Sequence, residues 1–265
     1  MGRAETEAAL GRLDELTRRL RRECPWDREQ DERSIVPHTV EEAYELADAA
    51  NAGDDEKLLD ELGDVLFQVH FLSLLLEERG AGDLAQVAEH CRRKLIRRHP
   101  HVFGDEADLV RDASDVLHRW DAIKRDEPGR EPGLFGEVPE GLPGPLLARK
   151  VQRRAASSGF DQDSPAPLLA GLEAQVEQLA DAAGAGAPRE SLFAEVGDVL
   201  FAAVNVARKL KVDPELALRA SSNRFRRRVE AAETLAEDAG LRWSALSFDE
   251  QIRFYAQVRL QEDSQ

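Results

Sequence analysis

The sequence predicts an all-α protein built of helical bundles, on three observations. Apolar residues recur at helical spacing along almost the whole chain, whereas sustained alternation of apolar and polar residues over a strand's length is hard to find. Only 6% of the 265 residues are aromatic, which suits helices packed through Leu, Val and Ala better than a β-sandwich. One long Pro- and Gly-rich stretch interrupts the helical pattern, so the helices are expected to fall into two parts.

The individual helices follow from apolar stripes and stop signals. A first helix is predicted from the leucine stripe Leu10, Leu13, Leu16 and Leu20. A second stripe, from Leu58 to Val69, predicts a helix that runs to the stop signal at Arg79-Gly80. A loop is expected between two helices at 184–188, where Gly, Ala and Pro cluster. Further helical patterns cover 83–98, 113–126, 145–157, 166–183, 188–211, 213–238 and 248–261.

The interruption at 127–145 is interpreted as a linker. It holds five of the twelve prolines and five of the eighteen glycines, so it cannot form a continuous helix. The predicted organisation is therefore an N-terminal helical module at 1–126, the linker at 127–145 and a C-terminal helical module at 146–265.

The two modules resemble each other in sequence. The segment Glu61-Leu-Gly-Asp-Val-Leu-Phe67 returns as Glu195-Val-Gly-Asp-Val-Leu-Phe201, an offset of 134. Two weaker matches follow in the same order and at nearly the same offset: 94–98 with 224–228, and Trp120 and Lys124 with Tyr255 and Arg259. The pattern indicates an internal duplication of one helical module.

Acidic residues form the most informative pattern. Glu41, Glu42 and Glu45 fall on one face of a helix, and Glu61 and Asp64 repeat this spacing on the next helix within an apolar segment. Acids beside core positions are costly unless they are paired or bind metal. Two antiparallel helices would gather at least four carboxylates into a hard-cation site of the kind that Mg²⁺ prefers. The alternative is a solvated acidic face, with Thr39 and Glu42 forming a capping box.

The charge balance and the cysteines exclude several classes of protein. The chain has 36 Lys and Arg against 52 Asp and Glu, a net charge of −16, which disfavours binding to nucleic acid or to anionic membranes. Its two cysteines form no CxxC pair and no disulfide framework, as expected in a reducing compartment, so a cytoplasmic location is predicted. No apolar run approaches the length of a membrane span, and a signal peptide is not expected.

Other catalytic motifs are missing from the sequence. It has no GxxxxGK[ST] or GxGxxG loop to hold phosphates and no GxSxG nucleophile motif. It also lacks the ExxH motifs of di-iron carboxylate bundles. The acidic pattern therefore carries the functional prediction.

Taken together, these segments resemble the MazG family of nucleoside triphosphate pyrophosphohydrolases, in its tandem two-domain form. The likeness rests on the acidic pattern and its duplicate, and it extends over essentially the whole chain. The other segments that carry it are Cys24-Pro-Trp-Asp27 with Gln30, Arg97-Arg-His-Pro-His-Val-Phe103, Trp120-Asp-Ala-Ile-Lys124, Lys150-Val-Gln and Gly159-Phe-Asp161.

The resemblance implies two tandem MazG-like helical modules, a homodimer, and Mg²⁺-dependent cleavage of NTPs and dNTPs into NMP or dNMP and pyrophosphate. Mn²⁺ is a possible substitute, and the expected role is nucleotide-pool housecleaning. In the first module it implies metal ligands at Glu42, Glu45, Glu61 and Asp64, and a water-orienting base at Glu41. It places substrate contacts at Lys94, Arg97, Arg98, Trp120 and Lys124.

In the second module the resemblance implies metal ligands at Glu177, Glu195 and Asp198, and substrate contacts at Arg224, Arg228, Tyr255 and Arg259. Aligning Glu173 with Glu41 places Ala174 where Glu42 stands in the first module, and alanine cannot coordinate a cation. The first module is therefore expected to be competent. The second is expected to be impaired, either binding nucleotide but hydrolysing it poorly or taking the missing ligand from Glu173 by a register shift.

Two alternative functions remain at the level of the sequence. One is a non-enzymatic acidic helical scaffold whose duplication serves partner binding. The other is a narrower all-α hydrolase that acts on dUTP or phosphoribosyl-ATP.

Overall fold

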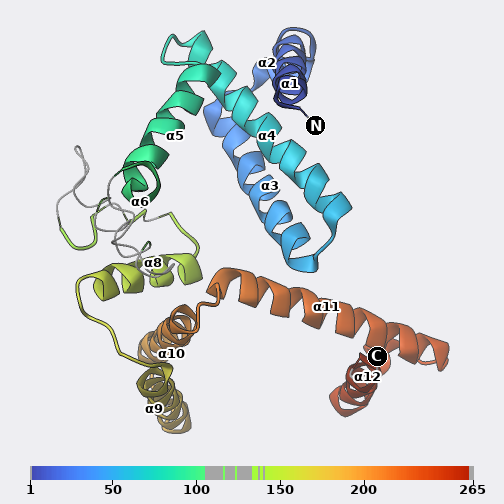
Figure 1. Cartoon of the computed structure of the whole chain (residues 1–265). Helices are drawn as coiled ribbons and strands as arrows, with labels where there is room; N and C mark the ends of the chain where they lie inside the picture. The colour runs from blue at the N-terminus through green and yellow to red at the C-terminus, as the bar shows by residue number, and fades with distance from the viewer. Residues whose placement is uncertain are drawn as a thin grey trace. The chain divides into compact units, whose positions relative to one another are not determined.

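The computed structural model describes residues 2–104, 116, 123, 133–136, 138–139 and 141–262, and its regular elements are all helices (Figure 1). The all-α prediction is confirmed. Two compact units divide the chain, Met1–Glu137 (unit 1) and Val138–Gln265 (unit 2), and each is described by itself. The helix expected at 113–126 and most of the expected linker lie outside the described residues, so the module boundaries stay a prediction. No described helix has an apolar stretch long enough to cross a membrane.

Unit 1 is organised around a pair of helices that contact each other along their length (Figure 1). The first of the pair starts at an Asp31–Ser34 capping box, and Gly53, with a φ of 71°, turns the chain into the second. The described helices of unit 1 are α1 (Arg3–Glu23), α2 (Pro25–Glu29), α3 (Glu32–Ala52), α4 (Asp55–Glu78), α5 (Leu84–Arg98) and α6 (Pro100–Phe103).

A small apolar core holds α3 against α4. Ile35 of α3 and Phe71 of α4 are fully buried and pack with Leu75, while Phe67 lies against this cluster. Helix α1 contacts α4 as well, and two arginines of α1 form ion pairs with the end of α4, Arg18 with Glu77 and Arg21 with Glu78. The α3–α4 hairpin is therefore the central element of unit 1.

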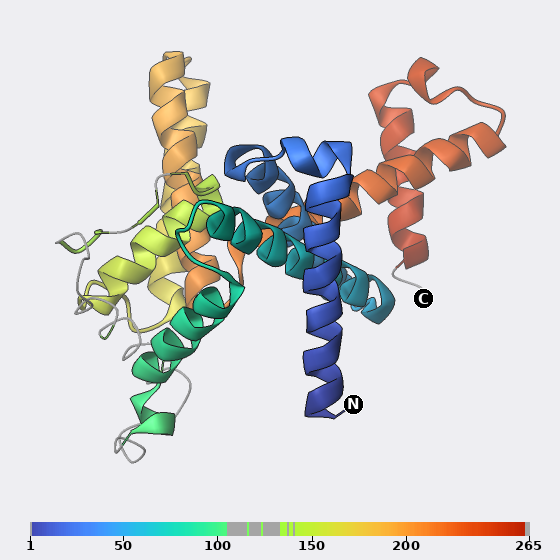
Figure 2. The ribbon, with the colours of Figure 1, turned by 90° about the horizontal axis from the view of Figure 1, so that it is seen from above.

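Unit 2 contains a second hairpin, in which the two helices again lie side by side (Figures 1 and 2). The described α-helices of this unit are α8 (Gly144–Ser157), α9 (Pro165–Gly184), α10 (Arg189–Lys209), α11 (Pro214–Asp238) and α12 (Phe248–Glu262), with a short 3₁₀ turn, η2 (Trp243–Ala245). Helices α9 and α10 form the hairpin, α8 contacts α10 and α11, and α12 packs on α11. Helix α8 begins at Gly144, slightly before the end of the expected linker.

The repeated sequence takes the same place in both hairpins. Glu61 is the seventh residue of α4, and Glu195 is the seventh residue of α10. The two acidic residues therefore occupy equivalent positions on the second helix of each hairpin.

Candidate active site

Helices α3 and α4 bring three glutamates together. Glu42 and Glu45 lie one turn apart on α3, and Glu61 lies on α4. One carboxylate oxygen from each of the three lies within 4.8 Å of the other two. We call Glu42, Glu45 and Glu61 the acidic cluster. Three carboxylates this close repel one another strongly unless protons or a cation reduce their charge.

Burial makes the acidic cluster more costly. Glu61 is only 5% exposed, and its Oε2 has no hydrogen-bond partner among the described residues. Burial raises the pKa of Glu61 above its ordinary value, and Glu45 adds to the effect, while Lys57 opposes it with its Nζ 3.9 Å from Glu61 Oε1. Burial also raises the pKa of Glu42, followed by the negative charges of Asp64 and Glu45. The charged forms of Glu42 and Glu61 are therefore disfavoured, a cost that a bound cation would relieve.

The capping-box alternative for Thr39 and Glu42 is wrong. Helix α3 already begins at Glu32, so Thr39 lies inside the helix, where its hydroxyl donates to Gln68 Oε1 of α4 at 3.1 Å. The solvated-face alternative also fails for Glu61, because that carboxylate is buried.

Two further predicted acids lie at the edge of the acidic cluster. Asp64 is exposed on α4 and lines an open pocket of about 700 Å³ together with Lys57. Glu41 is also exposed, and its Oε2 lies 3.2 Å from Nδ1 of His38. Their assigned roles, Asp64 as a metal ligand and Glu41 as a base, stay predictions.

The predicted phosphate contacts of the first module lie on α5. Lys94 is half-buried, Arg97 is exposed and Arg98 is buried. Helix α5 packs against α4 and α6, and Figure 1 shows it diverging from the α3–α4 hairpin. The described unit therefore does not place this basic helix over the acidic cluster. Trp120 and Lys124 lie outside the described residues.

In unit 2 the predicted metal ligands are not gathered in the same way. Glu177 is exposed on α9, and on α10 Glu195 is half-buried and Asp198 is exposed. In the described part of unit 2, no three carboxylate, histidine or cysteine side chains come as close together as those of the acidic cluster. This difference accords with the alanine at position 174.

The predicted substrate contacts of unit 2 lie on α11 and α12. Arg228 forms an ion pair with Glu262 at 2.6 Å, and a hydrogen bond with Tyr255 helps to raise the pKa of Arg228. The Tyr255 ring also packs against Phe225, with ring centroids 5.9 Å apart. Arg224 and Arg259 are both exposed. Arg228 and Tyr255 thus lie together, and their roles as substrate contacts stay predictions.

Two residues near the acidic cluster were missed by the sequence analysis. Lys57 stands one turn before Glu61 on α4, with its Nζ 3.9 Å from Glu61 Oε1, a helical spacing that the sequence displays. His38 stands three residues before Glu41 and also packs edge-on against Trp26, with ring centroids 5.7 Å apart. The contact with Trp26 joins α2 to α3 and could not be predicted from spacing.

The acidic cluster fits a hard divalent cation. Its donors are all carboxylate oxygens, which Mg²⁺ and Mn²⁺ prefer, and the unpartnered Glu61 Oε2 offers a buried acceptor. A cation bound there would offset both the burial and the charge repulsion that raise the pKa of Glu42 and Glu61.

Comparison with known proteins identifies the family. The model of the MazG nucleotide pyrophosphohydrolase domain matches residues 30–103, the part of unit 1 that contains the acidic cluster. A nucleoside triphosphate pyrophosphohydrolase of Escherichia coli (strain K12) is 35% identical over 259 residues, which cover 96% of this chain and 98% of that protein. A nucleoside triphosphate pyrophosphohydrolase/pyrophosphatase MazG of Thermotoga maritima is 39% identical over 219 residues, 82% of each chain. The similarity spans both units, and this chain belongs to the MazG nucleotide pyrophosphohydrolase family.

Proposed function

We propose that this protein is a nucleoside triphosphate pyrophosphohydrolase that acts on NTPs and dNTPs in nucleotide-pool housecleaning. Water adds to the α-phosphorus, the bond from that phosphorus to the α–β bridging oxygen breaks, and NMP or dNMP and pyrophosphate are released. The observation that carries the proposal is the acidic cluster, because three converging carboxylates are the donor set for a cation that binds triphosphate.

We assign the role of Mg²⁺ ligand to four residues, Glu42, Glu45, Glu61 and Asp64. Mn²⁺ could substitute for Mg²⁺. When bound, the ion would neutralise phosphate charge and lower the pKa of a coordinated water. Asp64 also lines the open pocket on α4, whose other charged lining residues are Lys57 and the carboxylates Asp54, Glu56 and Asp60. Because the bound ion would compensate the negative charge of the carboxylates and the phosphates, a chain of net charge −16 could still bind an anionic nucleotide.

The remaining groups of unit 1 have roles in positioning and proton transfer. Glu41 is exposed beside the acidic cluster and would accept the proton of the attacking water, oriented by its contact with His38. Lys94, Arg97, Arg98 and Lys124 are assigned to the phosphates and Trp120 to the base, although α5 does not lie over the acidic cluster of the same described unit. These cations would also share the negative charge that develops on the departing pyrophosphate.

Product analysis by anion-exchange chromatography tests the proposal. The full chain is incubated with each NTP and dNTP, with Mg²⁺ and with excess chelator. We expect NMP or dNMP plus pyrophosphate in the presence of Mg²⁺ and no turnover in chelator. NDP plus phosphate would contradict the cleavage position, and the absence of turnover with every nucleotide would favour the scaffold alternative. Turnover restricted to dUTP would favour the narrower hydrolase, and phosphoribosyl-ATP is included as a further substrate for the same reason.

We also propose that the protein is a homodimer and that it works in the cytoplasm. The α3–α4 hairpin leaves a set of large apolar side chains exposed, which is unusual for the surface of a monomer. They are Val36, Val40, Leu59, Leu62, Leu66 and Val69. A second copy of the hairpin would cover them.

A further inference from the structure

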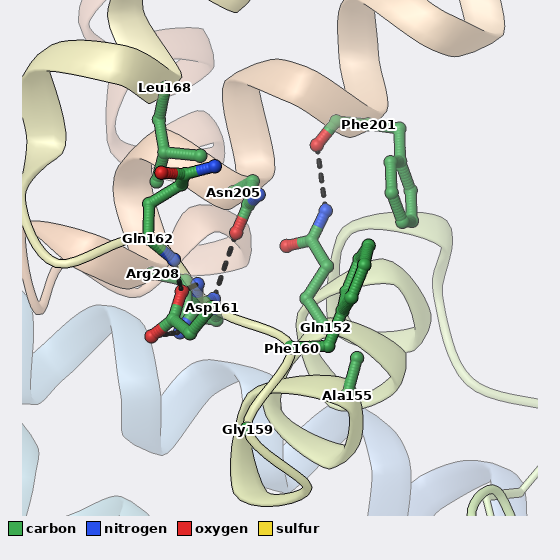
Figure 3. A pocket seen from close by; sticks show the side chains of 10 residues that line it. All are labelled: Gln152, Ala155, Gly159, Phe160, Asp161, Gln162, Leu168, Phe201, Asn205 and Arg208. Atoms are coloured by element: carbon green, nitrogen blue, oxygen red, sulfur yellow. Dashed lines mark hydrogen bonds and ion pairs between the residues drawn. The ribbon is translucent and has the colours of Figure 1, made fainter.

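Unit 2 contains a pocket that none of the predicted site residues lines. It has a volume of about 280 Å³ and lies between α8, the loop that follows α8, and the hairpin α9–α10 (Figure 3). Gln152, Phe160, Phe201 and Asn205 line it, and an ion pair between Asp161 and Arg208 closes one edge. We call it the amide pocket.

A buried glutamine gives the amide pocket an unused hydrogen-bond acceptor. Gln152 is 6% exposed, and its Nε2 donates to the Phe201 carbonyl at 2.8 Å. Because a carbonyl oxygen can only accept, this bond fixes which end of the amide faces Phe201. Gln152 Oε1 therefore points away from Phe201 (Figure 3) and has no partner among the described residues. A buried acceptor without a donor is costly, so a ligand that brings an N–H or O–H group would relieve it.

Two aromatic rings border the same pocket. Phe160 is 84% exposed and Phe201 is 45% exposed, although burial of a phenyl ring is strongly favourable. Both rings lie beside the Gln152 side chain in Figure 3. Exposed ring faces next to a buried acceptor suit a planar ligand that stacks and donates a hydrogen bond at the same time.

The charges at the edge of the pocket are already paired. Asp161 binds Arg208 at 2.5 Å and Lys209 at 3.1 Å. Arg208 Nε also donates to Asn205 Oδ1 at 2.9 Å, which leaves the amide nitrogen of Asn205 as a donor. The two charged residues that line the amide pocket, Asp161 and Arg208, thus compensate each other, and the lining offers one acceptor and one donor, which favours a neutral ligand.

We propose that the amide pocket binds a neutral nucleoside through its base. A nucleobase is planar and carries adjacent hydrogen-bond donors and acceptors, which match Gln152 Oε1 and the Asn205 amide nitrogen. At about 280 Å³ the pocket is small for a triphosphate but adequate for a base and part of its sugar. The site lies in unit 2 and needs no metal, so it is separate from the acidic cluster.

Equilibrium dialysis of the full chain against nucleosides in excess chelator tests this site. The probes are uridine and inosine, each paired with the analogue that is methylated on the ring N–H, 3-methyluridine and 1-methylinosine. We expect saturable binding of at least one nucleoside and roughly tenfold weaker binding of its methylated analogue, because that analogue has lost the donor for Gln152. The corresponding nucleoside monophosphate should bind no more tightly than the nucleoside.

Variants locate the bound nucleoside. Gln152→Leu and Phe160→Ala should each weaken binding about tenfold or more. The highly exposed Phe160 keeps the test valid if Gln152→Leu fails to fold. Phe193→Ala is the matched control, since Phe193 is 82% exposed on α10 and does not line the pocket.

Four results would overturn the proposal: no saturable binding at millimolar nucleoside, equal binding of the methylated analogues, binding unchanged by Phe160→Ala, or binding abolished by Glu61→Gln. Nucleoside binding is measured in chelator, whereas hydrolysis is measured in Mg²⁺, so the two experiments give independent results. Either proposal can therefore fail while the other stands.

Discussion

At the scale of a single residue, we expect the buried carboxylate of Glu61 to make the stability of the protein depend on a bound cation. The charge of this carboxylate is desolvated and lies close to Glu42 and Glu45, so in the absence of a cation it opposes folding. Glu61→Gln removes that charge while keeping the shape of the side chain. In chelator we expect the variant to melt a few degrees above the wild type, because an uncompensated charge has gone.

Added Mg²⁺ should reverse this order. A cation that binds only the folded state raises the melting temperature of the wild type and leaves that of Glu61→Gln unchanged. Differential scanning calorimetry across a Mg²⁺ titration measures both effects. Asp55→Asn is the control, because it removes one negative charge from an exposed position on α4. Its melting temperature should rise with Mg²⁺ as that of the wild type does. An equal Mg²⁺ response of Glu61→Gln and the wild type would refute the ligand assignment.

Asp161 provides a pH-dependent contact in unit 2. Hydrogen bonds from Arg208 and Lys209 lower its pKa to about 2, whereas an unfolded chain has a value of about 3.9. A lowered folded-state pKa stabilises the protein at pH values above the unfolded value, and this stability is lost as the pH falls toward the folded value. After an allowance for solvent screening, we expect Asp161→Asn to cost about 1 kcal/mol at pH 7. In urea unfolding, the difference between wild type and variant should shrink between pH 4 and pH 2, and a difference that is constant with pH would contradict the ion pair.

At the scale of elements, the α3–α4 hairpin depends on one aromatic contact. Phe71 of α4 is fully buried against Ile35 of α3, and the guanidinium of Arg21 lies 5.8 Å from the centre of its ring. Phe71→Ala should leave a cavity and lower the free energy of unfolding by about 3–5 kcal/mol. Phe103→Ala is the control, because Phe103 is largely exposed, and it should change stability by less than about 0.5 kcal/mol. Urea unfolding followed by circular dichroism compares the two, and equal effects would contradict the described core.

The local sequence predicted the helices well. The features that it did not predict depend on contacts between helices. Helix α5 begins after Asp83 and α4 ends near Gly80, because caps and glycines act over a few residues. The spacing of Thr39 and Glu42 suggested a helix start, whereas the Thr39 hydroxyl donates to Gln68 of α4, a contact that spacing does not reveal. The convergence of Glu42 and Glu45 with Glu61 was predicted from periodicity, because a short turn makes α3 and α4 neighbours. The amide pocket depends on the loop after α8, and no spacing in the sequence indicates where that loop lies.

At the scale of the whole molecule, the exposed apolar side chains of α3 and α4 are the proposed contact surface of the homodimer. If a second copy covers them, a charge placed among them should separate the copies at a cost of several kcal/mol, since burial of an unpaired charge is strongly unfavourable. We expect Leu62→Glu to convert a dimer into a monomer, as measured by size-exclusion chromatography with light scattering. Leu10→Glu, an exposed change on α1, should leave the mass unchanged. A wild type that is monomeric at tens of micromolar would refute the dimer.

The contributions of the two hairpins to nucleotide hydrolysis can also be compared directly. Glu61 and Glu195 occupy the same position on α4 and α10, but only Glu61 belongs to a cluster of three carboxylates among the described residues. The same substitution to glutamine should therefore have unequal effects in the full chain. We expect Glu61→Gln to lower kcat on the order of a hundredfold or more, and Glu195→Gln to leave it within about twofold. Steady-state release of pyrophosphate in Mg²⁺ measures both variants against the wild type. The reverse ranking would transfer hydrolysis to unit 2 and make the missing glutamate at Ala174 dispensable, whereas equal losses would mean that both units contribute to one reaction.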